Sequence, residues 1–322
     1  MLLSRVAADL YWLARYTERA ENTARILDVT TRLSALPSTY GGQTNEWESA
    51  VLATGSGEAF MERYGEATRR NVIDWLAFSL ENPSSIRSCF DIARRSARSV
   101  RTALTADMWE AINGAWLEMR RFSIESMSPR QLAEFLAFVI EASLRFDGSA
   151  YRTMLRTDAH AFFRLGTFVE RADATARILD VKYHVLLPEG EGVGGGLDYF
   201  QWSSILRGAS ALTAYQWVFR EAVRPWRVAE LLILRPELPR SIASCTDNLE
   251  HVIDGNALVV TGTGAPDPRC SALPLRAIAS GTPGQDGAQN QSDIEITHGV
   301  PAFGRDYGEA EVFPTDVNLD LY

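Results

Sequence analysis

The chain carries one twelve-residue segment twice. ERAENTARILDV at residues 18–29 returns as ERADATARILDV at residues 170–181, 152 positions later, with ten of the twelve letters identical. A second stretch, DWLAFSLENPSSIRSC (74–89), aligns with ELLILRPELPRSIASC (230–245) at an offset of 156. Because both anchors keep the same order and almost the same offset, we expect a tandem duplication of one structural unit.

The two predicted units, about 1–148 and 149–255, both read as sets of helices. The repeated segment belongs to a long helix in each unit, expected over about 3–34 in the first and 149–187 in the second. No convincing strand pattern of alternating apolar and polar residues precedes residue 256. The sequence therefore predicts an all-α helical bundle.

Capping signals mark the shorter helices of this bundle. Pro83 and Pro239 each stand shortly before a serine that can accept a hydrogen bond from the free N–H groups of a helix start. Two more helices are expected over 105–122 and 128–146. The second of these begins with Ser128 as N-cap, followed by proline at the first helical position.

Residues 256–322 do not fit the second unit. The offset places there the counterparts of the first unit's last helices, yet nine of the 23 glycines and six of the 13 prolines follow residue 250. Such a composition interrupts regular helices. From residue 251 onward, ten acidic and three basic residues give −7 of the chain's total charge of −9. We favour a disordered acidic tail, with an out-of-frame reading as the alternative.

Bulk composition restricts the class of protein. The net charge of −9 argues against a nucleic-acid binder that relies on phosphate contacts. Three scattered cysteines do not make a disulfide framework or a zinc site, and the four histidines show no metal-binding spacing. There is no signal-peptide core at the start and no run of eighteen apolar residues. We therefore expect a cytoplasmic protein that binds no nucleic acid, membrane or metal.

One side of the repeated helix reads as ordinary bundle core. At about 100° per residue, apolar residues of each copy fall on one arc. These residues are Leu13, Tyr16, Ala20, Ala24 and Leu27 in the first unit, and Leu165, Phe168, Ala172, Ala176 and Leu179 in the second. Because the small alanines allow close approach, we expect the two long helices to pack together with both arcs equally buried.

The opposite side of the repeated helix carries charges next to aromatic residues and valine, so we expect it to be covered as well. On a helical projection Glu18 lies within about 20° of Arg25, and Glu170 has the same relation to Arg177. The binding residues predicted from this polar layer are Glu18, Arg19, Asn22, Arg25, Glu170, Arg171 and Arg177.

Two interpretations of the polar layer stay open at this point. In the first, Glu18–Arg25 and Glu170–Arg177 are ion pairs that fix the packing, worth about 0–1 kcal/mol if exposed. In the second, the two helices frame a charged pocket for a peptide, an amino acid or a nucleotide, because arginine forks suit carboxylates and phosphates while glutamate suits an amine. The sequence shows no catalytic arrangement and no cofactor motif, so both remain unknown.

Three stretches resemble the alpha-E family, helical bacterial proteins named for a Glu-Arg motif. They are MLLSRVAADLYWLARYTERAENTARILDV at the start, LENPSSI, and GSAYRTMLRTDAHAFFRLGTFVERA at 148–172. The matching dipeptides are Glu18-Arg19 and Glu170-Arg171, each followed by alanine. The resemblance covers about residues 1–250, and family members continue with further helices where this chain becomes rich in glycine and proline.

This resemblance implies partners rather than a reaction. Family genes lie beside, or are fused to, circularly permuted ATP-grasp-type ligases, and often lie near transglutaminase-like proteins. It implies an accessory or interaction module that works with such a ligase in the formation or modification of peptide or amide bonds. The alternatives are an enzyme of the same pathway with Glu18 or Glu170 as general base, and a purely structural helical bundle.

Overall fold

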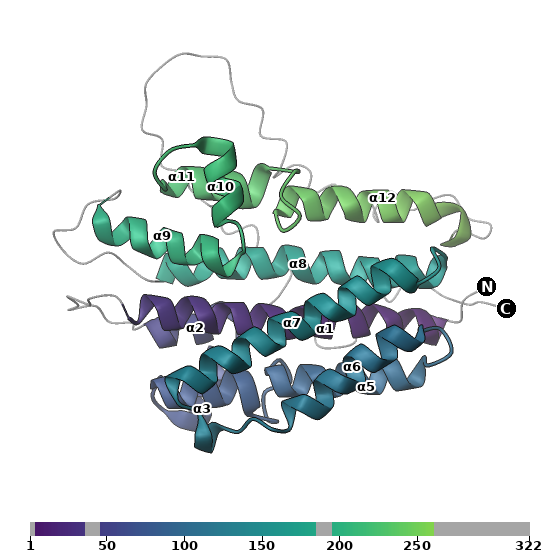
Figure 1. Ribbon diagram of the computed structural model, residues 1–322, viewed down its shortest axis with the longest axis horizontal. Helices are drawn as coiled ribbons and strands as arrows, with labels where there is room; N and C mark the ends of the chain where they lie inside the picture. Colours follow the sequence, from purple (N-terminus) through teal and green to yellow (C-terminus); the bar gives the residue numbers. More distant parts are fainter. Residues whose placement is uncertain (1–3, 36–45, 185–194, 261–322) are drawn as a thin grey trace, which may run out of the picture.

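The computed structural model describes residues 4–35, 46–184 and 195–260, and every regular element in these ranges is a helix. Four long helices lie side by side in the order α12 (Ile242–Val260), α8 (Asp158–His184), α1 (Ser4–Leu33) and α5 (Ile86–Ser99) (Figure 1). The predicted all-α class is confirmed for the described part of the chain, and α1 packs along α8 as expected.

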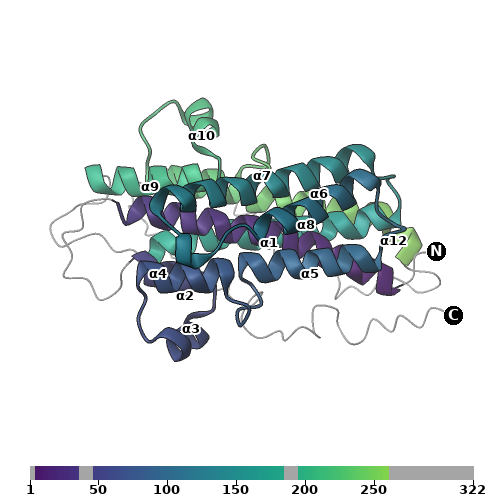
Figure 2. The ribbon, with the colours of Figure 1, turned by 60° about the horizontal axis from the view of Figure 1, so that its bottom comes forward.

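Two further helices cover α1 and α5 from one side. α6 (Ala106–Met119) packs on α5, and α7 (Pro129–Thr153) crosses α1 (Figure 2). The predicted start of α7 is confirmed in detail. The Ser128 hydroxyl accepts a hydrogen bond from the Gln131 backbone N–H, and the Gln131 side chain accepts one from the Ser128 N–H. This reciprocal capping fixes where α7 begins.

The other elements are shorter. They are α2 (Glu46–Ala53), α3 (Gly57–Tyr64), α4 (Arg69–Ile73), the π-helical η1 (Asp74–Phe78), the 3-10 turn η2 (Ile124–Ser126), α9 (Gly196–Gly208), α10 (Leu212–Phe219), α11 (Pro225–Ala229) and the π-helical η3 (Glu230–Leu234). α4 runs directly into η1, just as α11 runs into η3 156 residues later. The predicted caps are also confirmed, since Ser85 and Ser241 each accept a hydrogen bond from the backbone N–H three residues on.

The second long helix begins later than predicted. Residues 149–153 belong to the end of α7, which was expected to stop at residue 146, and α8 begins only at Asp158. Thr157 takes the N-cap position, because its carbonyl accepts a hydrogen bond from the Ala161 N–H at 3.0 Å. A threonine followed by an aspartate in the first turn is a helix-start signal that the prediction of a helix over 149–187 overlooked. Residues 185–187 lie outside the described part.

The boundary of the predicted tail also shifts. α12 continues to Val260, past the expected boundary at residue 255. The prediction of a disordered tail from there to the end falls on residues 261–322, which lie outside the described residues.

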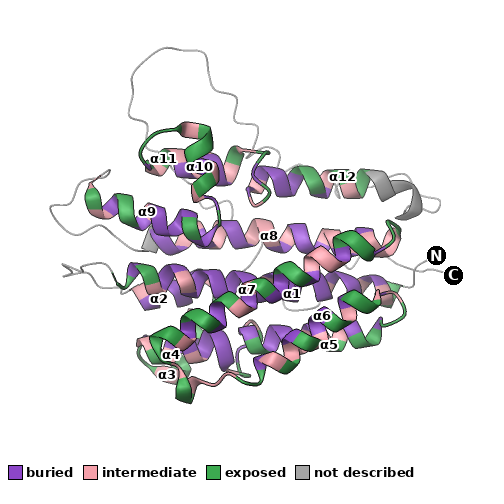
Figure 3. Ribbon diagram, in the orientation of Figure 1, coloured by how far each residue is buried: buried purple, intermediate pink, exposed green. Residues whose placement is uncertain are grey.

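The two predicted apolar arcs are not equally buried. On α1, all five residues of the arc are buried. On α8, Phe168 is buried, whereas the other four residues of the arc, Leu165, Ala172, Ala176 and Leu179, are partly exposed. The reason is that α5 and α7 both pack on α1, while within the described ranges α12 packs on α8 without a counterpart of α7. Figure 3 shows the contrast between the largely buried α1 and the more exposed pair of α8 and α12.

Two helical glycines are expected to respond in opposite ways to an added methyl group. A Cβ on Gly166 of α8 would lie 2.3 Å from the carbonyl oxygen of Tyr11 on α1, so Gly166→Ala forces the helices apart and is expected to cost about 1–3 kcal/mol. A Cβ on Gly148 of α7 would meet nothing within 4 Å, so Gly148→Ala is expected to add up to about 1 kcal/mol through helix propensity. Urea unfolding measures both effects. A Gly166→Ala protein as stable as the parent would contradict the close contact between α1 and α8.

Candidate functional site

The two Glu-Arg dipeptides meet where α1 packs against α8, and each bonds to the other. Arg171 donates two hydrogen bonds to the Glu18 carboxylate, from Nε to Oε1 and from Nη2 to Oε2, both at 2.9 Å. Arg19 does the same to Glu170, with distances of 2.7 and 3.1 Å. Paired forks of this kind are the strongest and most directional ion pairs available to proteins. The motif of one helix is therefore completed by the motif of the other.

Each glutamate also binds a second arginine. The Arg15 Nε donates to Glu170 Oε2 at 2.6 Å, and the Arg240 Nη1 donates to Glu18 Oε1 at 3.1 Å. Arg240 bonds to Glu21 as well. Two guanidinium groups thus neutralise each carboxylate of the repeated dipeptide.

The predicted pairs Glu18–Arg25 and Glu170–Arg177 are not formed. Residues seven apart share a helix side but lie about 10 Å apart along the axis, whereas residues four apart are neighbours. Arg25 accordingly pairs with Glu21, with 2.9 Å from Nε to Oε1, and Arg177 pairs with Asp173, with 2.7 Å from Nε to Oδ2. Both predictions were wrong, because each placed the acidic partner about one helical turn too far from its arginine.

Arg25 and Arg177 each bond in addition to the C-terminal end of a shorter helix. Arg25 of α1 donates to the carbonyl of Gly208, the last residue of α9, at 2.6 Å. Arg177 of α8 donates to the carbonyl of Ala53, the last residue of α2, at 2.9 Å. A cation at a helix C-terminus satisfies free carbonyls and the negative end of the helix dipole. These two arginines hold short helices against the long ones.

The charged groups at this contact form two largely buried networks, one around Glu170 and one around Glu18 and Glu21, which together we call the Glu–Arg layer. Its members are Glu18, Glu21, Glu170, Arg15, Arg19, Arg25, Arg171 and Arg240. The three carboxylates and five guanidinium groups leave an excess of two positive charges. One of these guanidinium groups, that of Arg25, also donates to the Gly208 carbonyl. Asn22 of α1 is also buried, and its Oδ1 has no hydrogen-bond partner in the described structure. Every ionised group of the layer has at least one partner.

Burial and charge act in opposite directions on the two repeated glutamates. Glu170 is only 2% exposed and Glu18 only 4%, and burial alone would raise the pKa of each carboxyl. The charges of Arg19 and Arg15, and the hydrogen bonds that they donate, outweigh burial and lower the pKa of Glu170 to about 2. Arg171 and Arg240 lower the pKa of Glu18 in the same way. Carboxylates held ionised by two guanidinium groups are weak general bases near neutral pH.

The other reactive side chains in the described core are also poorly suited to catalysis or metal binding. Burial raises the pKa of Cys89 and of Cys245 to about 12, so both thiols stay protonated at neutral pH. Within the described ranges, no three His, Cys, Asp or Glu side chains come together as a metal site. Among these residues, too, no helix is long and apolar enough to cross a membrane.

Three members of the Glu–Arg layer were absent from the predicted site, namely Arg15, Glu21 and Arg240. One signal for Arg240 was available, since the second repeated stretch carries Ser84 and Arg240 at matching positions. Ser84 accepts a hydrogen bond from Arg19 at 3.4 Å, and Arg240 reaches Glu18. Two segments that are repeated together can be expected to meet in space, and here they do.

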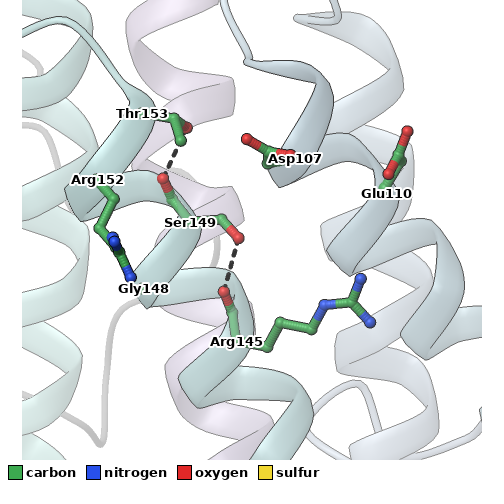
Figure 4. Close-up of a pocket in the computed structure, with 7 residues that line it drawn as sticks. All are labelled: Asp107, Glu110, Arg145, Gly148, Ser149, Arg152 and Thr153. Carbon is green, nitrogen blue, oxygen red and sulfur yellow. Dashed lines mark hydrogen bonds between the residues drawn. The ribbon is translucent and has the colours of Figure 1, made fainter.

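A separate groove lies between α6 and α7, outside all predicted site residues. It has a volume of about 540 Å³ and is lined by Asp107, Glu110, Arg145, Gly148, Ser149, Arg152 and Thr153. In Figure 4 the two carboxylates come from α6, and Arg145 extends toward them from α7. The hydroxyls of Ser149 and Thr153 donate to backbone carbonyls of their own helix. The groove therefore presents opposite charges on its two walls.

The comparisons with known proteins agree with the helical Glu-Arg arrangement. Residues 2–264 match the Alpha-E family, described as a predicted alpha-helical domain with a conserved ER motif. The chain belongs to this family. In the structure, both Glu-Arg dipeptides of this Alpha-E chain lie in the contact between α1 and α8 and bond across it.

Relatives of this Alpha-E chain occur in mycobacteria. An uncharacterized protein of Mycobacterium bovis and one of Mycobacterium tuberculosis are each 27% identical to it over 187 residues. The match covers 52% of this chain and 21% of each relative, so the chain spans about a fifth of the length of the curated relatives it matches. No solved structure matches the chain.

Proposed function

We propose that this Alpha-E chain is a cytoplasmic accessory or interaction module that works with an ATP-grasp-type ligase in the formation or modification of peptide or amide bonds. One observation carries the proposal: the Glu-Arg dipeptides of the family motif bond to each other and are enclosed. Their charged side chains therefore stabilise the packing of α1 against α8, and their bonding capacity is used within the fold. A module of this kind contributes surfaces to a partner rather than a catalytic carboxylate.

The lengths of the relatives support a role within a larger assembly. The mycobacterial proteins are about five times as long as the segment that they share with this chain. The alpha-E resemblance implies the ligase as the partner, with a transglutaminase-like protein as a further one. In the relatives the shared segment is joined to other parts of the same protein, which is consistent with a module that acts beside such parts.

We also propose that the chain consists of two copies of one helical unit. The shared order of elements supports this, because α4–η1–α5 is followed 156 residues later by α11–η3–α12. The reciprocal bonds support it further. Arg19 binds Glu170 as Arg171 binds Glu18, and Arg25 closes α9 as Arg177 closes α2.

Complex formation tests the proposed function. The chain is mixed with the purified ATP-grasp-type ligase encoded nearest to its gene, and the mass of the product is measured by light scattering after size exclusion. We expect a stoichiometric complex at micromolar concentration, and a change in the ligase's rate of ATP hydrolysis when the chain is added. Absence of both, with a folded chain and an active ligase, would refute the proposal.

The groove between α6 and α7 supports a second candidate function, the holding of a short peptide. The carboxylates of Asp107 and Glu110 suit a free amino terminus, and the Arg145 guanidinium suits a carboxylate. We expect calorimetry to detect dialanine with free termini and not its blocked form, and Gly148→Leu, which places a large side chain at a residue that lines the groove, to abolish the signal. Equal results for free and blocked dialanine would remove this candidate.

A further inference from the structure

The outer surface of α5 and of the turn that follows it is strongly basic. Residues 86–101 carry five arginines and one acidic residue, Asp91, an excess of four positive charges in a chain whose net charge is −9. Asp91 is already paired with Arg95, at 3.0 Å from Nε to Oδ2. Arg87 and Arg98 are exposed, and within the described ranges neither side chain has a hydrogen bond or an ion pair. These two guanidinium groups are therefore available to an acidic partner.

Tryptophans of α6 line the same surface. The guanidinium groups of Arg94 and Arg120 lie 4.1 and 5.2 Å from the Trp116 ring centroid, and that of Arg101 lies 5.4 Å from the Trp109 ring centroid. These contacts help to hold α5 against α6, but the two exposed arginines take no part in them. Arginine and tryptophan are enriched among the residues that contribute most to protein binding. We call this surface the α5–α6 face, formed by Arg87, Arg98, Arg101, Arg120, Trp109 and Trp116.

The chain contains an acidic segment that complements this face. Residues 306–322, DYGEAEVFPTDVNLDLY, hold five acidic residues and no basic one, and they lie outside the described residues. Tyr307, Phe313 and Tyr322 add three aromatic rings to the segment. Carboxylates pair with guanidinium groups, and aromatic rings stack on them. The segment therefore offers both kinds of group that the α5–α6 face can bind.

The position of α12 brings this segment within reach of the face. α5 and α12 end on the same side of the bundle, where α1 begins (Figure 1), and Ser99 at the end of α5 donates to Asp9 of α1 at 2.6 Å. Because α12, α8, α1 and α5 lie side by side at about 8–10 Å per step, the chain leaves α12 about 30 Å from α5. A random coil as long as residues 261–305 has an end-to-end distance of about 35–40 Å. A tether that matches the span in this way gives the highest effective concentration.

We propose that residues 306–322 bind to the α5–α6 face of the same chain, with their carboxylates on Arg87 and Arg98. The tether favours the segment of the same chain over that of a second copy, because it raises the local concentration to about the millimolar range. Any other acidic partner of this face has to displace the segment. The proposal does not depend on the ligase partnership, since it concerns two parts of one chain.

Crosslinking of carboxylates to amines tests the contact on the full chain. A carbodiimide joins the two groups only when they are in contact, and the chain's only lysine, Lys182, is just 7% exposed. Arg98→Lys keeps the positive charge and adds an amine to the face. Trypsin cleaves after Arg305, so residues 306–322 form one peptide. We expect mass spectrometry to find this peptide joined to the new amine.

Arg207→Lys is the matched control. Arg207 of α9 is also exposed, and its side chain has no hydrogen bond or ion pair within the described ranges. We expect Arg98→Lys to give at least about ten times as much product with residues 306–322 as Arg207→Lys does. The product is also expected to decrease at about 1 M sodium chloride, where the screening length is only about 3 Å.

Two outcomes would overturn the proposal. Equal yields from the two variants, or no product that contains residues 306–322, would show that the segment does not bind to the α5–α6 face. A mixture of isotope-labelled and unlabelled Arg98→Lys chains separates one chain from two. We expect products within one chain, whereas products that join labelled to unlabelled chains at the statistical frequency would assign the face to the segment of a second copy.

Discussion

Glu170→Ala is expected to lower the free energy of unfolding by about 3–5 kcal/mol, the usual cost of removing one partner from a buried ion pair. The substitution leaves both Arg15 and Arg19 without their carboxylate, at a site where Glu170 is almost fully enclosed. Glu18→Ala is expected to have an effect of similar size, because Arg171 and Arg240 lose the same partner.

A matched control lies on the same helix as Glu18. Asp28 of α1 pairs with Arg32 at 2.9 Å, but their side chains are 31% and 45% exposed. Asp28→Ala is therefore expected to cost only about 0–1 kcal/mol. Urea unfolding of the variants gives the comparison. If Glu170→Ala lost no more stability than Asp28→Ala, the layer would have to be regarded as an ordinary surface network.

The parent protein is also expected to lose stability as the pH falls from about 4.5 toward 2. The pKa of Glu170 is about 2 in the folded chain and has its ordinary value of 4.5 in the unfolded chain. Between these values the unfolded chain holds more protons, so acid favours unfolding. The contribution of Glu170 is complete above its unfolded pKa and is lost as the pH falls through its folded pKa. A difference of this size corresponds to roughly 3 kcal/mol, and the lowered pKa of Glu18 adds to it in the same direction.

Glu170→Gln separates this contribution from the other carboxylates. The amide keeps the shape of the side chain and cannot titrate, so the variant starts less stable and is expected to lose less on acidification. Urea unfolding at pH 6, 4 and 3 measures both slopes. If the parent and the variant lost equal amounts of unfolding free energy as the pH fell, protonation of Glu170 would not be the cause of the loss.

The elements of the fold could be predicted where local signals decide them. The serine caps before α5, α7 and α12 follow from short-range hydrogen bonding, and the sequence shows them directly. The start of α8 was missed because the long apolar pattern across residues 149–187 hid the signal at Thr157 and Asp158. When the same apolar periodicity continues across two consecutive helices, it does not show where the first helix ends and the second begins.

The partners inside the Glu–Arg layer could not be predicted from a single helix. Glu18 shares a helix side with Arg25, but its carboxylate points to Arg171, which lies 153 residues away in the chain. The predicted residues include five of the eight charged residues of the layer, and Arg15, Glu21 and Arg240 are missing from them. Which residue pairs with which depends on how α1 and α8 are aligned, and that alignment is set by packing such as the close approach of Gly166 to Tyr11. The unequal burial of the two apolar arcs was missed for the same reason, because similar sequences in α1 and α8 do not ensure that the same elements pack on them.

The exchange of Glu–Arg pairs between α1 and α8 is tested most directly by two double-mutant cycles, measured by urea unfolding with glutamine as the replacement at every position. We expect a coupling free energy of about 2–3 kcal/mol between Glu18 and Arg171, and less than about 1 kcal/mol between Glu18 and Arg25. A larger coupling of Glu18 to Arg25 than to Arg171 would contradict the exchange of pairs between the two helices.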